Sequence, residues 1–375
     1  MTFENWYNKN YKKILVLPAL IILLSFSYLA FFYYQNGDIM NKDVSLTGGT
    51  SITFSSDLNA AQVQQELSDE FSSISVKAIS DGTGTQKSLI LIVPGDDSAE
   101  VKSILEDYLG YELTNENSSI EFTGSSLGAD FYKQLIRAVV FAFLLMALVV
   151  FLVFGENKKV KVYAMILTIV ITRITFPASR FLNILVLFSG IVLFLYSLYI
   201  SKTKKYYIYT LITFAVFLII YIFPNYLFII PVAIFLFAVY TTISIPSMAV
   251  IFSAFADIII SLAIVDFIGM KISSAGIVAF LMLIGYSVDT DILLTTRVLK
   301  REGESVNQAI LGAFKTGTTM TITSIIAVAV ALVLVYNFGS ILNQIFTILL
   351  LGLVFDLFNT WVTNTSIIKW YVEKK

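Results

Sequence analysis

Residues 246–267 read PSMAVIFSAFADIIISLAIVDF, a run of 22 residues in which only Asp257 and Asp266 carry charge. A run of this length and composition crosses the hydrocarbon core of a bilayer as one helix, which takes about 20 residues. Apolar residues make up 57% of the 375-residue chain and charged residues 14%, against about 45–50% and about 25% in soluble domains. The composition therefore excludes an ordinary soluble globular protein and predicts a polytopic α-helical membrane protein.

Nine further apolar runs are interpreted as membrane-spanning helices, so that the sequence predicts ten spans. Basic residues gather at the ends that this arrangement places inside, for example at 158–161, 202–205 and 297–301, as the positive-inside rule requires. Both termini are then cytoplasmic. The run 162–176 is short. If it does not cross the membrane, one neighbouring run cannot cross either, and the chain has eight spans. The ten predicted spans are residues 14–34, 135–154, 162–176, 181–200, 206–223, 226–243, 246–267, 273–295, 318–336 and 340–368.

Residues 37–130, between the first and second predicted spans, have the composition of a soluble domain. They hold 16 acidic and 4 basic residues, whereas the rest of the chain is basic, and such asymmetry suggests two compartments. The acidic charge either contacts a substrate or partner or only keeps the domain soluble. Alternating and helical patterns follow one another in the order βαββαβ, which is typical of the ferredoxin-like arrangement. A single span on each side predicts that the whole domain lies on one face of the membrane, the external one.

Several classes of function are excluded by what the chain lacks. It has no cysteine and no histidine, which rules out disulfides, thiolate metal sites, cysteine nucleophiles and histidine-based catalysis. The sequence also shows no phosphate-binding glycine loop, zinc motif or nucleophile elbow. We therefore expect no enzymatic activity, no cofactor, no metal ion and no nucleic-acid partner.

Acidic residues inside the membrane are the strongest functional signal. A carboxylate in hydrocarbon costs several kcal/mol, so such a residue usually faces the interior of a bundle and marks an ion pathway, unless it is paired to hold helices together. Asp266 lies near the outer end of its span, where it reaches water, whereas Asp257 and Asp356 are central. The five acidic residues in or beside the predicted spans are Asp257, Asp266, Asp289, Asp291 and Asp356.

Asp289 and Asp291 are two positions apart on one predicted helix, about 200° around its axis, so they cannot face the same groove. Asp289 shares a face with Gly285, where a neighbouring helix can approach closely and exclude water. Asp289 is therefore the first choice for the ion-coupling carboxylate. Replacing it with asparagine is expected to abolish ion coupling, and Asp291→Asn is expected to have a milder effect.

The ninth predicted span carries hydroxyl groups next to a lysine. Residues 318–324 read TTMTITS and include Thr319; hydroxyls at such positions either hold helices together or carry protons. Lys315, one turn earlier, either anchors the helix at the inner surface or reaches toward Asp289. Lys315 and Thr319 therefore join Asp257, Asp289, Asp291 and Asp356 as ion-coupling candidates.

Four motifs occur in an order and topology that resemble a known family. They are LTGGTS at residues 46–51, GSSLG at 124–128, the span from Pro246 through Asp257 to Lys271, and IGYSVD at 284–289 followed by Arg297. Together they are similar to the SecD/SecF family of protein-export subunits, within the resistance-nodulation-division superfamily. The size of the external domain resembles SecF, the smaller of the paired subunits, and DTDILLTTR at 289–297 resembles its archaeal form.

The resemblance implies a six-helix core, into which this chain inserts about four further helices. The external-domain motif would be Thr47, Gly48, Gly49 and Thr50. The implied parts are residues 1–36 (N-terminus and first span), 37–130 (external ferredoxin-like domain), 131–157 (second span), 158–244 (inserted spans) and 245–375 (last four spans of the core).

The resemblance also implies a multi-pass subunit of the cell membrane that couples an ion gradient, in the first instance of protons, to late steps of protein translocation. The implied partners are a SecD-like subunit, the Sec translocon channel, translocating secretory proteins and membrane lipid. A SecD-like subunit, a transporter or lipid exporter of the same superfamily, and a membrane scaffold are the alternatives. In the bacterial SecF the acid of this span falls at Thr290, and in SecD at the place of Asp289, which leaves the choice between Asp289 and Asp291 open. The usual arginine of the next span is Lys315, and the usual short link between the second and third spans is replaced by residues 158–244.

Overall fold

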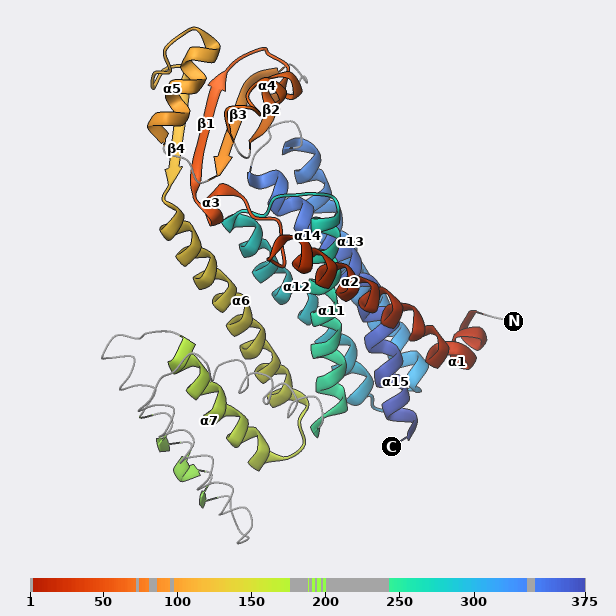
Figure 1. Cartoon of the computed structure of the whole chain (residues 1–375). Coiled ribbons are helices and arrows are strands. Elements are labelled where there is room, and N and C mark those ends of the chain that lie inside the picture. Colours follow the sequence, from red (N-terminus) through yellow and green to blue (C-terminus); the bar gives the residue numbers. More distant parts are fainter. Residues whose placement is uncertain are drawn as a thin grey trace.

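The computed structural model describes residues 3–71, 74–80, 86–94, 98–175, 243–335 and 341–374, with a few short pieces between residues 188 and 199. Figure 1 shows a helical bundle with a small sheet unit at one end. Six helices in these described residues are long and apolar enough to cross a membrane. The predicted inserted helix 162–176 is found as α7 (Lys158–Thr175), whereas the predicted helices 181–200, 206–223 and 226–243 lie largely outside the described residues. The count of ten spans stays a prediction.

The sheet unit has the βαββαβ order that the sequence predicts. Its four strands are all antiparallel to their neighbours and lie in the order β2-β3-β1-β4. Both helices cover one face, where alternate residues of β1 and β3, such as Ile52 and Leu89, pack on Val63 and Val101 in a closed core. The elements are β1 (Gly49–Ser55), α4 (Ala60–Glu66), β2 (Ser75–Ser80), β3 (Gln86–Pro94), α5 (Ser98–Leu109) and β4 (Ser118–Thr123).

A hydrogen bond between the two helices of this unit fixes their spacing. The Tyr108 hydroxyl of α5 donates to the Glu66 carboxylate at the end of α4, at 2.5 Å. This bond, together with partial burial, raises the pKa of Tyr108 to about 12. The same bond, with a second one from Gln62, holds the pKa of Glu66 below its usual value.

The spans predicted in the described residues are confirmed as helices, and some run further than the apolar runs. α6 begins ten residues before the predicted start at 135 because its polar first turns continue the helix beyond the apolar run. α13 likewise begins before 318, since Ala309, Ala313 and Gly317 bury one face of an amphipathic extension. The helices are α1 (Phe3–Ile14), α2 (Val16–Asn36), α6 (Ser125–Phe154), α11 (Ile245–Phe267), α12 (Ser274–Leu299), α13 (Val306–Val335), α14 (Ile341–Asn359) and α15 (Thr365–Lys374).

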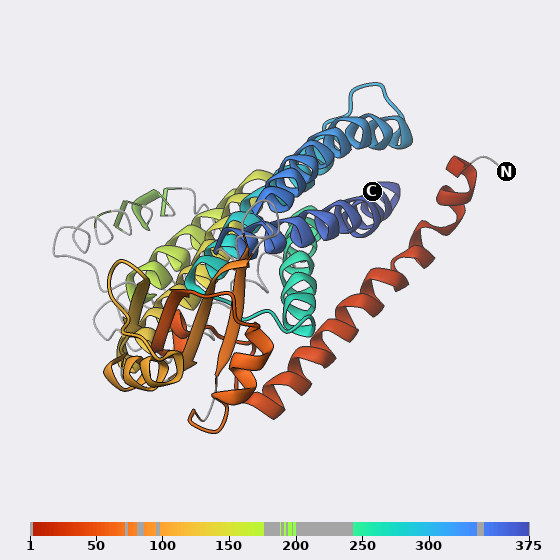
Figure 2. The ribbon, with the colours of Figure 1, turned by 90° about the horizontal axis from the view of Figure 1, so that it is seen from above.

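Three helices, α11, α12 and α14, form the centre of the bundle. They pack on one another, while α2 packs on α11, α6 on α11 and α12, and α13 on α12 and α14. In the most apolar stretch of each helix, 67% of α11 and 56% of α12 is buried, but only 6% of α13. Figure 2, seen from above, shows α2 and α13 standing apart on different sides of this group. The centre is therefore where polar side chains can be shielded from lipid.

The two glycine motifs of the sequence meet where the sheet unit joins the bundle. Residues 47–50 turn the chain from the short helix α3 (Val44–Thr47) into β1, with Gly48 at φ +82° and Gly49 at φ +138°. Residues other than glycine rarely adopt such backbone angles. Gly128, in the first turn of α6, packs on this turn so closely that a Cβ there would lie 2.7 Å from the backbone nitrogen of Gly48. Thr50 is fully buried, and the Thr47 hydroxyl donates to the Asp43 and Gly48 carbonyls.

Candidate functional site: a buried carboxylate cluster

Each of the three central helices carries one carboxylate that is fully shielded from solvent. Asp257 lies on α11, Asp291 on α12 and Asp356 on α14, and the exposed fraction of each is 0%. The three carboxylates act on one another electrostatically. The sequence predicts central positions for Asp257 and Asp356, and the structure brings both together with Asp291.

Asp257 has both carboxylate oxygens occupied by neighbours from the other two helices. The Ser287 hydroxyl of α12 donates to one oxygen at 2.6 Å, and the Asn359 amide of α14 donates to the other at 2.6 Å. Both donors are themselves buried. Asp257 thus ties α11 to α12 and α14.

Asp291 and Asp356 are each only half satisfied. The Asn364 amide donates to one oxygen of Asp291 at 2.7 Å, and the Thr360 hydroxyl donates to one oxygen of Asp356 at 3.2 Å. Among the described residues, the other oxygen of each carboxylate and the Ser253 hydroxyl on α11 are buried without a partner in hydrogen-bonding geometry, although Ser253 lies beside Asp291 and Ser287 beside Asp356. Buried polar atoms without partners are rare in folded proteins, so their gathering here makes the cluster the candidate functional site.

A π-helical turn, η3 (Thr360–Asn364), places the polar donors around the cluster. The backbone N–H of Thr365 donates to the carbonyl of Thr360, five residues earlier, in place of the four of an α-helix. Residues five apart in an α-helix point about 140° away from each other. The wider turn lets Asn359 and Asn364 both face carboxylates of the central helices.

The cluster has no basic partner in the described part of the chain, where no ion pair involves any of the three carboxylates. Three ionised carboxylates buried together repel one another and lose their hydration, so the cluster has to take up protons or a cation to persist. In the same described residues, no three acidic side chains come close enough to share one metal ion. The arrangement is therefore suited to taking up and releasing protons or a cation.

The close approach of a neighbouring helix to Gly285, which is the reason for preferring Asp289 over Asp291, is not found in the described residues. Asp289 and Gly285 do share a face, but that face is exposed, and no atom of another element lies within 4 Å of the position of a Gly285 Cβ. The opposite face, with Ser287, Asp291 and Thr295, is the buried one. The close approach of a helix occurs there, because Asp291 faces α14 and η3 rather than the outer surface.

Lys315 and Thr319 lie outside the cluster as well. Both side chains are exposed on α13, and the Thr319 hydroxyl donates to the Lys315 carbonyl in its own helix at 2.7 Å. No ion pair joins Lys315 to Asp289 among the residues that the structure describes. Of the run 318–324, Thr321 reaches the interior, where its hydroxyl lies 3.4 Å from that of Thr290.

Several cluster residues have no place in the sequence-based prediction: Ser253, Ser287, Asn359, Thr360 and Asn364. The signal for most of them is present in the sequence, since residues 359–366 read NTWVTNTS inside a run that is otherwise apolar. Two asparagines within a membrane span are costly unless they meet polar partners across helices. Asp266, expected to reach water, is instead 3% exposed.

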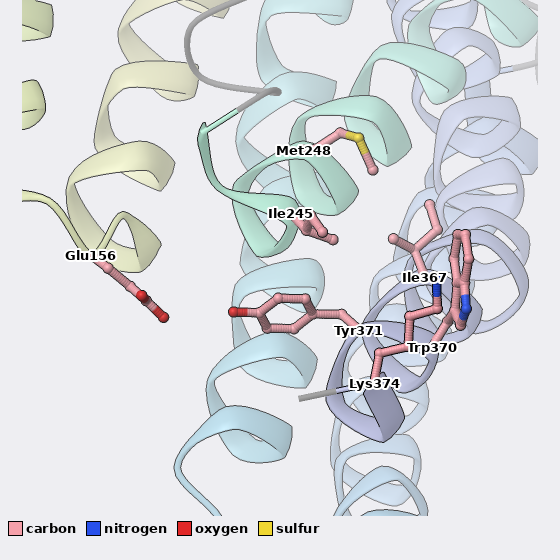
Figure 3. A pocket seen from close by; sticks show the side chains of 7 residues that line it. All are labelled: Glu156, Ile245, Met248, Ile367, Trp370, Tyr371 and Lys374. Atoms are coloured by element: carbon pink, nitrogen blue, oxygen red, sulfur yellow. The ribbon is translucent and has the colours of Figure 1, made fainter.

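A separate pocket of about 560 Å³ lies at the end of the bundle away from the sheet unit. Figure 3 shows Ile245 and Met248 of α11 facing Ile367 and Trp370 of α15, with Tyr371 pointing toward Glu156. The pocket contains none of the cluster carboxylates. It is therefore not part of the candidate site.

Comparison with known proteins places these features in a family context. Residues 199–374 match the family model described as "Protein export membrane protein SecD/SecF, C-terminal". The protein-export membrane protein SecF of Methanolacinia petrolearia is 48% identical over 134 residues, which are 35% of this chain and 47% of that protein. The SecF of Methanocaldococcus jannaschii is 28% identical over 371 residues, which are 98% of this chain and 97% of that protein.

A solved structure shares the fold. The crystal structure of SecDF from Thermus thermophilus, described as a translocon-associated membrane protein, superimposes with a TM-score of 0.53 at 13% identity. The superposition covers 97% of this chain and 38% of that one. Together with the six apolar helices, these similarities identify a multi-pass membrane protein.

Proposed function

We propose that the chain is a SecF-type subunit of the SecD/SecF family of protein-export membrane proteins, to which it is similar, and that it couples a proton gradient to late steps of protein translocation. The observation that supports the proposed coupling is the cluster of Asp257, Asp291 and Asp356, one on each central helix and all fully buried. A titratable group that holds three helices together biases their packing through its charge state, which is what gradient-driven movement requires. No catalytic residue, cofactor or metal is part of the proposal.

The sheet unit is the external domain in this proposal, and its strand order 2-3-1-4 is the reason for assigning it the ferredoxin-like arrangement. A SecD-like subunit, the translocon channel and the translocating chain are the proposed partners, with membrane lipid around the spans. Only 6% of the most apolar stretch of α13 is buried. Exposed faces such as this one leave room for a second membrane subunit. The acidic charge of residues 37–130 is proposed to face substrate or partner outside the cell.

Affinity purification of the full chain from its native membrane tests this assignment. We expect a SecD-like protein and a translocon channel to copurify in mild detergent. We also expect that depletion of the chain slows export in vesicles only when a proton gradient is imposed. Copurified lipid without either protein partner, or export that is equally slow with and without the gradient, would contradict the proposal.

The proposed orientation is tested by cysteine labelling, which is direct because the chain has no native cysteine. Gln62 of the sheet unit and Glu304, between α12 and α13, are both exposed and serve as a matched pair. A membrane-impermeant maleimide is expected to label Gln62→Cys in intact cells and Glu304→Cys only after permeabilisation. Labelling of Glu304→Cys in intact cells would contradict the predicted topology, which places this residue on the cytoplasmic side.

A further inference from the structure

The segment that leaves α2 and leads to the sheet unit is fastened to the bundle along its whole length. We name residues 38–43 the strap. The strap follows Gly37, which ends α2 in a left-handed conformation at φ +72°, and ends at Asp43, whose carboxylate caps α3 by accepting from the N–H of Val44. In its middle, Met40 is buried in the core that α11, α12 and α14 share. Only α3 separates the strap from β1.

α11 holds the strap through Asp266. The backbone N–H of Asn41 donates to one oxygen of the Asp266 carboxylate at 2.9 Å. Asp266 is 3% exposed and its other oxygen has no partner in the described structure. Asp266 lies nine residues after Asp257 on the same helix, about 14 Å along its axis. The helix that carries one cluster carboxylate therefore ends on the strap.

α12 holds the strap through the loop that precedes it. Lys42 forms a parallel β-bridge with Ile272: the N–H of Ile272 donates to the Asn41 carbonyl at 2.6 Å, and the N–H of Asp43 donates to the Ile272 carbonyl at 3.0 Å. Ser273, the next residue, caps the first turn of α12. The helix that carries Asp291 thus begins at Ser274, two residues beyond Ile272 of the bridge.

α14 holds the same loop through Gln344. The Gln344 amide oxygen accepts from the backbone N–H and the hydroxyl of Ser273, at 3.1 and 2.5 Å, and its amide nitrogen donates to the Lys271 carbonyl. One side chain therefore satisfies three polar groups of the loop that binds the strap. Gln344 lies in the first turn of the helix that carries Asp356.

The strap also has a fixed point on α6, outside the central group. Lys42 pairs with Asp38 at 2.7 Å, the Tyr132 hydroxyl donates to Asp38 at 2.8 Å, and the Lys42 ammonium lies over the Tyr132 ring at 4.7 Å. Half-burial acts to raise the pKa of Asp38, but the hydrogen bonds from Lys42, Tyr132 and the Ile39 N–H outweigh it, so this pKa is lowered. The pairing therefore stays ionised at neutral pH.

We propose that the strap transmits rearrangements of the carboxylate cluster to the external domain, and that Asp266 and Gln344 are positioning residues that hold it to the central helices. The inference rests on the proposed function. α11 and the loop before α12 are bonded directly to this segment, and α14 is bonded to that same loop, all at the sheet end of the bundle; no longer linker intervenes before β1.

The physical reason is that the strap has little freedom to absorb a displacement. Its backbone is held by main-chain bonds and by a buried carboxylate, and breaking any of them would leave a buried polar group without a partner, which is costly. A shift of α11, α12 or α14 when the cluster changes charge is therefore passed to the chain rather than lost in a flexible loop. A contiguous physical connection between two sites can carry coupling of this kind, and the strap supplies one.

The test measures movement of the external domain directly. Spin labels are placed on Gln62→Cys in the sheet unit and Val153→Cys at the far end of α6, both on exposed side chains of the full chain. Their distance distribution is recorded in proteoliposomes with and without an imposed proton gradient, and the infrared band of protonated carboxylic acids is recorded in parallel. We expect the wild-type distance distribution to shift with the gradient.

Two variants remove fastening points, and one keeps them. Asp266→Ala deletes the acceptor of the Asn41 N–H, whereas Asp266→Asn keeps an amide oxygen in the same place and is the matched control. Gln344→Met removes the polar groups of Gln344 at nearly constant size, at a site away from Asp266. We expect the gradient-dependent shift to fall at least threefold in Asp266→Ala and in Gln344→Met, and to persist in Asp266→Asn. The carboxylic acid band should change with the gradient in all three.

The outcomes separate the strap from the function on which it rests. A full wild-type shift in both Asp266→Ala and Gln344→Met would contradict the proposed role of the strap and leave the proposed gradient coupling intact. A wild-type distance that does not respond to the gradient, although the carboxylic acid band does, would also overturn the strap. Absence of any response in that band would instead overturn the proposed function and the strap with it.

Discussion

Replacement of Asp291 with asparagine is expected to slow gradient-dependent export at least tenfold while the protein still folds and binds its partner. Asparagine has nearly the same shape as aspartate but does not ionise, so the cluster loses one of the carboxylates whose charge it needs to change. Asn364, which donates to Asp291, can still donate to the amide oxygen of an asparagine. One of three mutually repelling acidic groups is removed, so the fold itself should not be weakened.

The measurement is the initial rate of export into vesicles with an imposed proton gradient. Asp289→Asn is the matched control, because it makes the same chemical change two residues away on the exposed face of α12. We expect it to stay within twofold of the wild type. If Asp291→Asn exports at the wild-type rate and Asp289→Asn does not, the outer face of α12 carries the coupling and the buried cluster is a packing element.

A single methyl group at Gly128 is expected to destabilise the connection between the sheet unit and the bundle. The Cβ of Gly128→Ala would lie 2.7 Å from the Gly48 nitrogen and 3.2 Å from the Leu46 carbonyl, all backbone atoms that cannot rotate away. Gly48 is itself held at φ +82°, so the turn has little room to adjust. Overpacking of this kind costs about 1–3 kcal/mol, and the apparent melting temperature of the purified protein should fall by several degrees.

Gly124, four residues earlier at the start of the same helix, is the control for this prediction. A Cβ there meets no atom within 4 Å, and the backbone angle is an ordinary φ of −59°. Gly124→Ala should therefore change the stability by less than about 1 kcal/mol. Equal melting temperatures for Gly124→Ala and Gly128→Ala would mean that the contact between Gly48 and Gly128 does not limit stability.

The elements of the fold were largely predictable, because each has a local signal. Alternation marks β1 and β3, helical spacing marks α4 and α5, and long apolar runs mark α11 and α12. The pairing of β1 with both β3 and β4 follows from the βαββαβ order. The ends of α6 and α13 were not predictable from hydropathy, since polar turns continue these helices past the apolar runs.

The candidate site was predictable in part. Its three carboxylates stand out in the sequence because charge is rare in a membrane span. Which of Asp289 and Asp291 faces inward depends on how α12 is rotated in the bundle. That rotation is set by contacts with α11 and α14, which the sequence of α12 alone does not reveal. The roles of Asn359 and Asn364 could not be predicted either. Both face the cluster because of a π-helical turn, which no local sequence pattern indicates.

The π-helical turn also bears on how the chain changes during evolution. A π turn contains one residue more than the α turn that it replaces, so it is a place where a span can gain or lose one residue without breaking. Loss of one residue from 360–364 would let the N–H of Thr365 bond the Thr360 carbonyl as in an α turn, so the helix beyond it would keep its orientation. Lys369 would then keep its bond to Asn307. A deletion in this turn is therefore expected to change only the side chains of the turn itself, such as Asn364, which donates to Asp291.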